Sequence, residues 1–168
     1  YVADTLEDPQ SGTNRELSYT LQLIAQQRQR ANRVKLETPI QVCIGNPPYK
    51  DKSAGLGGWV EKGSANSNHA PLDDFRKEGN GKYEYVLKNS YVYFWRWAMW
   101  KVFESIPHST DGVICFITAT GYLNGPGFKG MREWIRRNTS RGWIINLTPE
   151  GMQPPAKNAV FNIETPDR

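Results

Sequence analysis

The sequence predicts an α/β fold with a mostly parallel sheet, because apolar runs with strand character alternate with segments of helical periodicity. The three predicted strands are residues 40–45, 113–118 and 142–147. Helical segments between strands allow the crossovers that parallel pairing needs. The chain has 168 residues, which suffices for one domain built on one hydrophobic core.

The N-terminal part is predicted to contain a strand end and a helix. Residues 1–3 resemble the last turn of a strand whose beginning lies upstream of the chain. Residues 16–35 are predicted to be helical, because Leu17, Leu21 and Ile24 recur at helical spacing and the opposite face is polar and basic. The incomplete strand suggests a piece of a larger polypeptide.

The middle of the chain is predicted to be a loop followed by a buried helix. Residues 50–81 are rich in Gly, Ser and Asn, and a loop of this length is expected to be a mobile lid. Residues 83–105 carry aromatic side chains on most sides at helical spacing, so that helix should be buried on most sides. Residues 113–118 form a continuous apolar run, typical of a strand covered on both faces.

A short basic helix is predicted at residues 128–138, after a loop at residues 121–127. The helix carries four cationic side chains, Lys129, Arg132, Arg136 and Arg137. Exposed cations of this kind either contact phosphate or face solvent.

Composition permits several classes of partner and excludes others. Apolar residues make up 38% and charged residues 23%, and the formal net charge is +4, which allows a polyanionic partner without requiring one. No apolar run is long enough to span a membrane, and no signal peptide is recognisable. Cys43 and Cys115 fall in strand-like runs and are expected to be buried free thiols, which favours a cytoplasmic location. No Cys/His cluster has the spacing of a metal site.

The most informative motif is Asn46-Pro47-Pro48-Tyr49, directly after the first predicted strand. The prolines make the segment stiff, and Asn46 is held extended because a proline follows it. The carbonyl groups of Asn46 and Pro47 can accept both protons of an exocyclic amine, while Tyr49 stacks on the ring that carries it. Adenine fits this description. A Pro-Pro pair after a strand can also simply turn the chain.

Three segments in order resemble the adenine-N6 DNA methyltransferases. Residues 46–49 look like the catalytic motif IV, residues 89–94 look like motif V, and residues 111–118 look like motif VI. Residues 82–89, 125–133 and 143–151 are similar to the methylase portion of large single-chain restriction-modification enzymes.

The resemblance implies a partial Rossmann-like domain that uses S-adenosylmethionine and acts on an adenine flipped out of DNA. Asn46, Pro47 and Tyr49 would be catalytic, and Pro48 would complete the target-base pocket. Asp4, Asn46 and Tyr91 would lie on the cofactor side. The four cations of residues 128–138 would contact DNA.

The sequence departs from this family in two places. The glycine-rich cofactor loop is absent and expected upstream of Tyr1, so the chain alone should hold the cofactor poorly. Thr118-Ala119-Thr120 stands where the family often has a proline. Two alternatives therefore remain: methylation of a protein glutamine or an RNA base, and an inactive fragment that only binds nucleic acid, through Arg28, Arg30 and Arg33 or through the basic helix.

Overall fold

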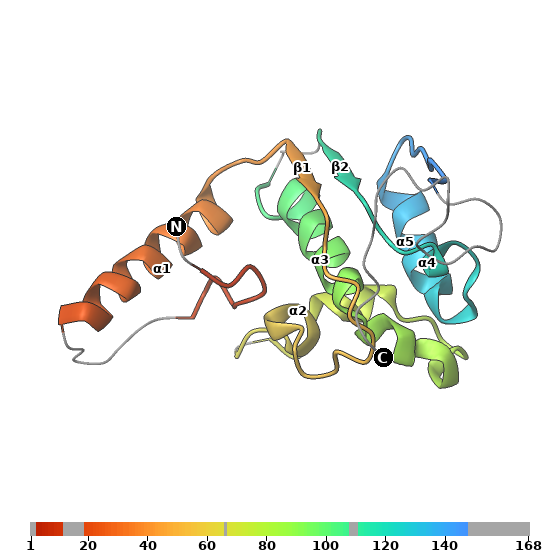
Figure 1. Ribbon diagram of the computed structural model, residues 1–168, viewed down its shortest axis with the longest axis horizontal. Coiled ribbons are helices and arrows are strands. Elements are labelled where there is room, and N and C mark those ends of the chain that lie inside the picture. The colour runs from red at the N-terminus through yellow and green to blue at the C-terminus, as the bar shows by residue number, and fades with distance from the viewer. Residues whose placement is uncertain (1–2, 12–18, 66, 108–110, 148–168) are drawn as a thin grey trace.

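The structure is a computed structural model that describes residues 3–11, 19–65, 67–107 and 111–147. Helix α1 (Tyr19–Glu37) leads to strand β1 (Val42–Gly45), which lies beside β2 (Val113–Phe116) (Figure 1). Five helical segments connect the strands: α2 (Gly58–Lys62), the 3-10 helices η1 (Pro71–Phe75) and η2 (Gly81–Lys88), α3 (Ser90–Met99) and the π-helical turn η3 (Trp100–Glu104). Three more follow β2: α4 (Gly121–Asn124), η4 (Pro126–Phe128) and α5 (Lys129–Asn138).

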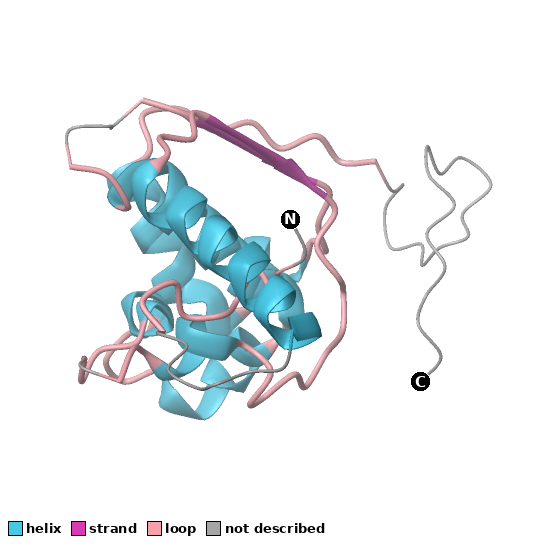
Figure 2. Cartoon of the chain, turned by 90° about the vertical axis from the view of Figure 1, so that its left-hand side faces the viewer, coloured by secondary structure: helices cyan, strands magenta, loops and turns pink. Residues whose placement is uncertain are grey.

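The two strands pair in parallel, with Val42 opposite Val113 and Gly45 opposite Phe116. Figure 2 shows the strands with the helices to one side of them. The ring of Trp95 from α3 meets the ring of Phe116 edge-on, with centroids 5.0 Å apart. A Cβ atom on Gly45 would lie 3.0 Å from the Phe116 ring, so glycine at this position leaves room for that ring beside β1. The parallel pairing agrees with the sequence prediction.

The opposite face of the sheet is open, which corrects the prediction of strands covered on both faces. Ile44 is 76% exposed, and Val42 and Val113 are exposed as well. No described segment packs over these side chains. For the same reason Cys115 is exposed rather than buried, whereas Cys43, on the helix side, is half-buried. Both thiols are free, and burial raises the pKa of Cys43.

The hydrophobic core surrounds α3, and Ile114 of β2 packs against it. Its fully buried members include Val92 and Met99 of α3. The predicted single helix over residues 83–105 is instead three consecutive elements, η2, α3 and η3. The break falls at Asn89, whose backbone is extended (φ −92°, ψ 142°). Its side-chain oxygen accepts the Lys52 N–H at 3.1 Å, and this long-range contact accompanies the break in the helix.

The predicted mobile loop at residues 50–81 is packed into the core and contains α2 and η1. Val60, Leu72 and Phe75 from this stretch are fully buried. Its Gly-, Ser- and Asn-rich composition concealed these short helical turns, because only a few apolar side chains anchor them. The prediction that the whole stretch forms a mobile lid is therefore wrong.

Three other predictions concern the ends and the basic helix. The helix predicted at residues 128–138 is confirmed as α5. The strand predicted at residues 142–147 does not form, because no described strand pairs with it, and Trp143 is 79% exposed. At the N-terminus, residues 1–2 of the predicted strand end lie outside the described residues, and residues 5–6 form a turn; Leu17 also lies outside the described residues.

Candidate functional site

The motif residues 46–49, called here the 46–49 loop, begin at the carboxyl end of β1, as the sequence predicts. The Gly45 carbonyl accepts the Ile117 N–H at 3.1 Å, so the loop leaves a strand end that is hydrogen-bonded to the chain after β2. Asn46 and Pro48 are exposed, whereas Pro47 is buried. Ligands of parallel α/β folds bind beyond such strand ends. The loop thus presents Asn46 outward from a fixed base.

Asn46 and Tyr49 contact each other within the loop. The Tyr49 hydroxyl donates a hydrogen bond to Asn46 Oδ1, with the two oxygens 2.5 Å apart. Burial raises the pKa of the half-buried Tyr49, which keeps its hydroxyl protonated as a donor. The acceptor predicted to receive an exocyclic amine is therefore engaged by Tyr49 when no base is bound. Sequence reasoning assigned the two side chains to one site but missed this direct contact.

Tyr91 lies near the chain that follows the 46–49 loop, but it belongs to the core. Its side chain is 3% exposed, and its ring packs near Phe128 with centroids 6.2 Å apart. Burial first, and then the negative charge of Asp51, raise the pKa of the Tyr91 hydroxyl above its ordinary value, against a hydrogen bond with the Asn89 side chain. A ring this deeply buried is part of the hydrophobic core.

Asp4 has a local structural role in the N-terminal turn. Its Oδ1 accepts the Leu6 N–H at 2.9 Å, which closes a turn of the kind that aspartate commonly stabilises. Its carbonyl oxygen accepts a hydrogen bond from Lys35 Nζ at 2.6 Å. Leu6 in turn packs on α2 by accepting the Trp59 N–H. Asp4 therefore joins the N-terminal turn to α1.

The four cations of α5 differ in their availability. Arg132 donates from one nitrogen to the carbonyls of Tyr122 and Gly125, at 2.8 Å each, so it holds the preceding turn in place. Arg137 pairs with Glu133 at 2.5 Å. Lys129 and Arg136 are exposed.

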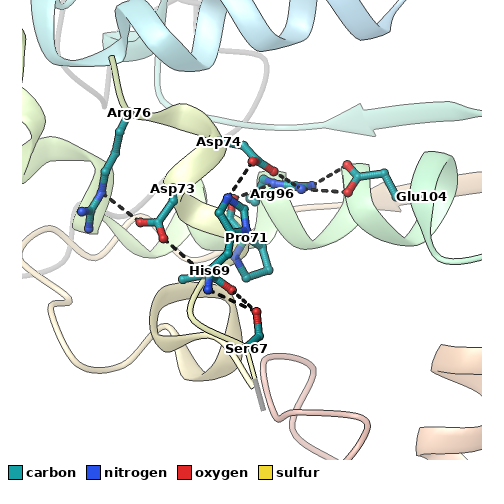
Figure 3. Close-up of polar contacts among 9 residues, drawn as sticks. Ser67, His69, Pro71, Asp73, Asp74, Arg76, Arg96 and Glu104 are labelled. Carbon is teal, nitrogen blue, oxygen red and sulfur yellow. Dashed lines mark hydrogen bonds and ion pairs between the residues drawn. The ribbon is translucent and has the colours of Figure 1, made fainter. Parts of the chain in front are cut away.

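A buried arginine network, shown in Figure 3, was not predicted from the sequence. Arg96 of α3 is 2% exposed, and its guanidinium binds both oxygens of Glu104 at 2.8 Å and Asp74 at 2.5 Å. Its Nε donates to the Pro71 carbonyl at 2.9 Å. His69 Nε2 lies 3.1 Å from the other oxygen of Asp74. The available signal was an arginine between two tryptophans in an otherwise apolar helix.

A cavity of about 320 Å³ borders this network, with the rings of Trp59 and Trp100 in its wall. Arg96 of α3 binds the carboxylates of Asp74 in η1 and of Glu104 at the end of η3, and so joins these three elements. Because each oxygen of Asp74 and Glu104 already has a partner, the network acts as a structural joint. The cavity is lined by different residues from the 46–49 loop.

The described residues do not fit S-adenosylmethionine. Asp4 is engaged in its own turn, Tyr91 is enclosed in the core, and no described strand leads into a glycine-rich loop. Within the described part of the chain, no helix is long and apolar enough to cross a membrane, and no cluster of His, Cys, Asp and Glu could hold a metal ion.

Comparison with known proteins gives no relative for this chain. No protein-family model, no curated protein and no solved structure matches it.

Proposed function

We propose that this chain carries the target-base site of an adenine-N6 DNA methyltransferase belonging to a restriction-modification system. The observation that carries the proposal is the 46–49 loop, which stands at the carboxyl end of a parallel strand with Asn46 exposed and in contact with Tyr49. The proposal includes a cytoplasmic location and the remainder of a larger restriction-modification polypeptide. The exposed apolar face of the sheet is consistent with such additional parts.

The loop has the chemistry to hold an adenine amine. Asn46 Oδ1 and the Pro47 carbonyl are two acceptors for the two N–H groups of N6, and Tyr49 supplies a ring for stacking on a base that has left the duplex. Accepting both N–H groups draws electron density onto N6 and fixes its orientation, so positioning and electrostatics carry the activation. A bound base that lacks the amine covers these acceptors without supplying donors to them, at a cost of about 1–3 kcal/mol.

Asn46 Oδ1 already has one donor within the loop. It accepts the Tyr49 hydroxyl in the structure, so the N6 amine takes the second lone pair of this oxygen or replaces that donor. The stacking on Tyr49 adds a favourable contribution of about 1–3 kcal/mol. Binding of the amine therefore changes the partners of Asn46.

Methyl transfer needs a methyl donor as well as a bound base. S-adenosylmethionine is the proposed methyl donor, yet the described residues do not fit it. They account for the base half of the chemistry only. DNA would be held by backbone phosphates near Lys129 and Arg136, the exposed cations of α5.

Methylation in cells tests this proposal without knowledge of a recognition sequence. A polypeptide containing this chain is expressed in cells that lack adenine methylation, and N6-methyladenine is measured in their DNA by mass spectrometry. Asn46→Ala is expected to abolish the signal, whereas Asn68→Ala, at another exposed asparagine, leaves it unchanged. Undiminished methylation by a folded Asn46→Ala protein overturns the proposal. Methylation of glutamine peptides or RNA, with none on DNA, overturns its substrate class.

A further inference from the structure

The chain just after the 46–49 loop is fastened to the start of α3. The Ser90 N–H donates to the Lys50 carbonyl at 2.9 Å, and the Ser53 N–H donates to the Lys88 carbonyl at 2.8 Å. These main-chain bonds join two segments separated by nearly forty positions in the sequence. The loop therefore has a second fixed end, in addition to its origin in β1.

Two hydroxyl groups complete this connection. Ser53 is 0% exposed, and its Oγ donates to the Lys50 carbonyl at 3.0 Å while lying 2.7 Å from Ser90 Oγ. Because the Ser53 hydroxyl has one proton and gives it to Lys50, the Ser90 hydroxyl must donate to Ser53. The Lys50 carbonyl thus accepts two hydrogen bonds, which uses both of its lone pairs.

Asn89 adds a side-chain contact to the same connection. Its Oδ1 accepts the Lys52 N–H at 3.1 Å, from a residue with positive φ (52°). A lysine rarely adopts this left-handed conformation without external support. On the inner side, the Tyr93 hydroxyl donates to the Ser53 carbonyl at 3.2 Å. These contacts therefore connect the residues after the 46–49 loop to α3. Each buried polar group named here has a hydrogen-bond partner.

We infer that Ser53 and Asn89 are positioning residues for the 46–49 loop. The inference rests on the proposed function, because it assigns them the task of fixing the two amine acceptors. With β1 at one end, these contacts at the other and two prolines between, the carbonyls of Asn46 and Pro47 have little freedom. An acceptor pair held in this way is preorganised for the base, and a misplacement of about 1 Å can cost about 100-fold in rate.

Hydrogen exchange of the full 168-residue chain tests the positioning role independently of activity. Ser53→Ala and Asn89→Ala are expected to speed about tenfold the exchange of the amides of residues 53 and 90, which donate to the Lys88 and Lys50 carbonyls, while exchange in α5 stays unchanged. Ser105→Ala is the matched control, because it removes a hydroxyl bonded to the Lys101 carbonyl outside this connection. Asn89→Asp, which keeps the acceptor oxygen, is expected to restore slow exchange.

Kinetics in the methylating polypeptide separates this inference from the proposed function. There Ser53→Ala is expected to lower kcat about tenfold with KM for DNA little changed, since base placement is affected more than DNA binding. Faster exchange of the amides of residues 53 and 90 without any wild-type methylation sustains the positioning role and overturns the proposed function. Unchanged exchange of these two amides in both alanine variants, or faster exchange spread evenly over the domain, overturns the positioning role whatever the activity.

Discussion

At the scale of single residues, Tyr49 has two competing roles. Its hydroxyl holds Asn46 Oδ1 when no base is present, and its ring is the proposed stacking surface for the base. The hydroxyl therefore competes with the adenine amine, whereas the ring favours the adenine. Substitutions can separate the two roles because phenylalanine keeps the ring and removes the donor.

Tyr49→Phe is expected to bind adenine-containing single-stranded DNA at least as tightly as the wild type, because it keeps the stacking ring and leaves Asn46 Oδ1 to the amine alone. Tyr49→Ala is expected to weaken binding by about 1–3 kcal/mol through lost stacking. Fluorescence anisotropy with an oligodeoxyadenylate measures both effects. Equal weakening by Phe and Ala would show that the hydroxyl, rather than the ring, supports the base.

The buried lysine Lys101 makes the free energy of unfolding depend on pH. Lys101 Nζ donates to the Lys35 carbonyl at 2.6 Å near the end of α1, and burial lowers the pKa of Lys101 below its ordinary value of 10.5. The unfolded chain therefore binds more protons than the folded one in the pH range just below 10.5, so the free energy of unfolding rises with pH there.

Relative to Lys101→Met, the wild type is expected to gain stability as the pH rises between about 8 and 10, by at most about 1.4 kcal/mol per pH unit. Urea unfolding across this range measures the difference. A constant difference between wild type and Lys101→Met would contradict the assignment.

At the scale of elements, Arg96 joins η1 to the α3–η3 junction. Removing a buried cation leaves the carboxylates of Asp74 and Glu104 without their partner. Arg96→Met is therefore expected to lower the free energy of unfolding by about 3–5 kcal/mol. Arg137→Met, which breaks the exposed pair with Glu133, should cost no more than about 1 kcal/mol. Equal costs in urea unfolding would contradict a structural joint at Arg96.

Elements with strong local patterns could be predicted from the sequence. The basic helix, the aromatic helical stretch and the two paired strands depend on periodicity and composition within a few residues of each position. The break at Asn89 could not be predicted, because it accompanies a contact with Lys52 that the sequence does not reveal. The strand at 142–147 failed for a related reason, since strand character alone does not supply a pairing partner.

In the candidate site, too, only the features that depend on neighbouring residues in the sequence could be predicted. The position of Asn46 and Tyr49 beyond β1 followed from residues adjacent in sequence. The partner exchange at Asn46, the support from Ser53 and the ion network of Arg96 depend on contacts between residues whose chemistry has several uses. Asp4 illustrates the limit, because an aspartate near a predicted strand end suits a cofactor site and a local turn equally well.

At the scale of the whole molecule, the formal net charge of +4 is modest, so DNA binding should depend on where the cations lie. Lys129→Gln and Arg136→Gln are each expected to reduce the slope of log K against log salt by about one. Arg33→Gln on α1, where Arg33 lies 3.9 Å from Glu37, should change it little. A slope insensitive to the α5 substitutions would contradict DNA contact at this helix.

The central claim is that the 46–49 loop recognises the amine of adenine, and base discrimination tests it most directly. The measurement compares binding of oligonucleotides that carry either adenine or purine, which lacks the amine, at one unpaired position. The account predicts that the wild type prefers adenine by about 1–3 kcal/mol and that Asn46→Ala loses most of this preference. Equal affinity of the wild type for the two bases, or an undiminished preference in Asn46→Ala, would contradict it.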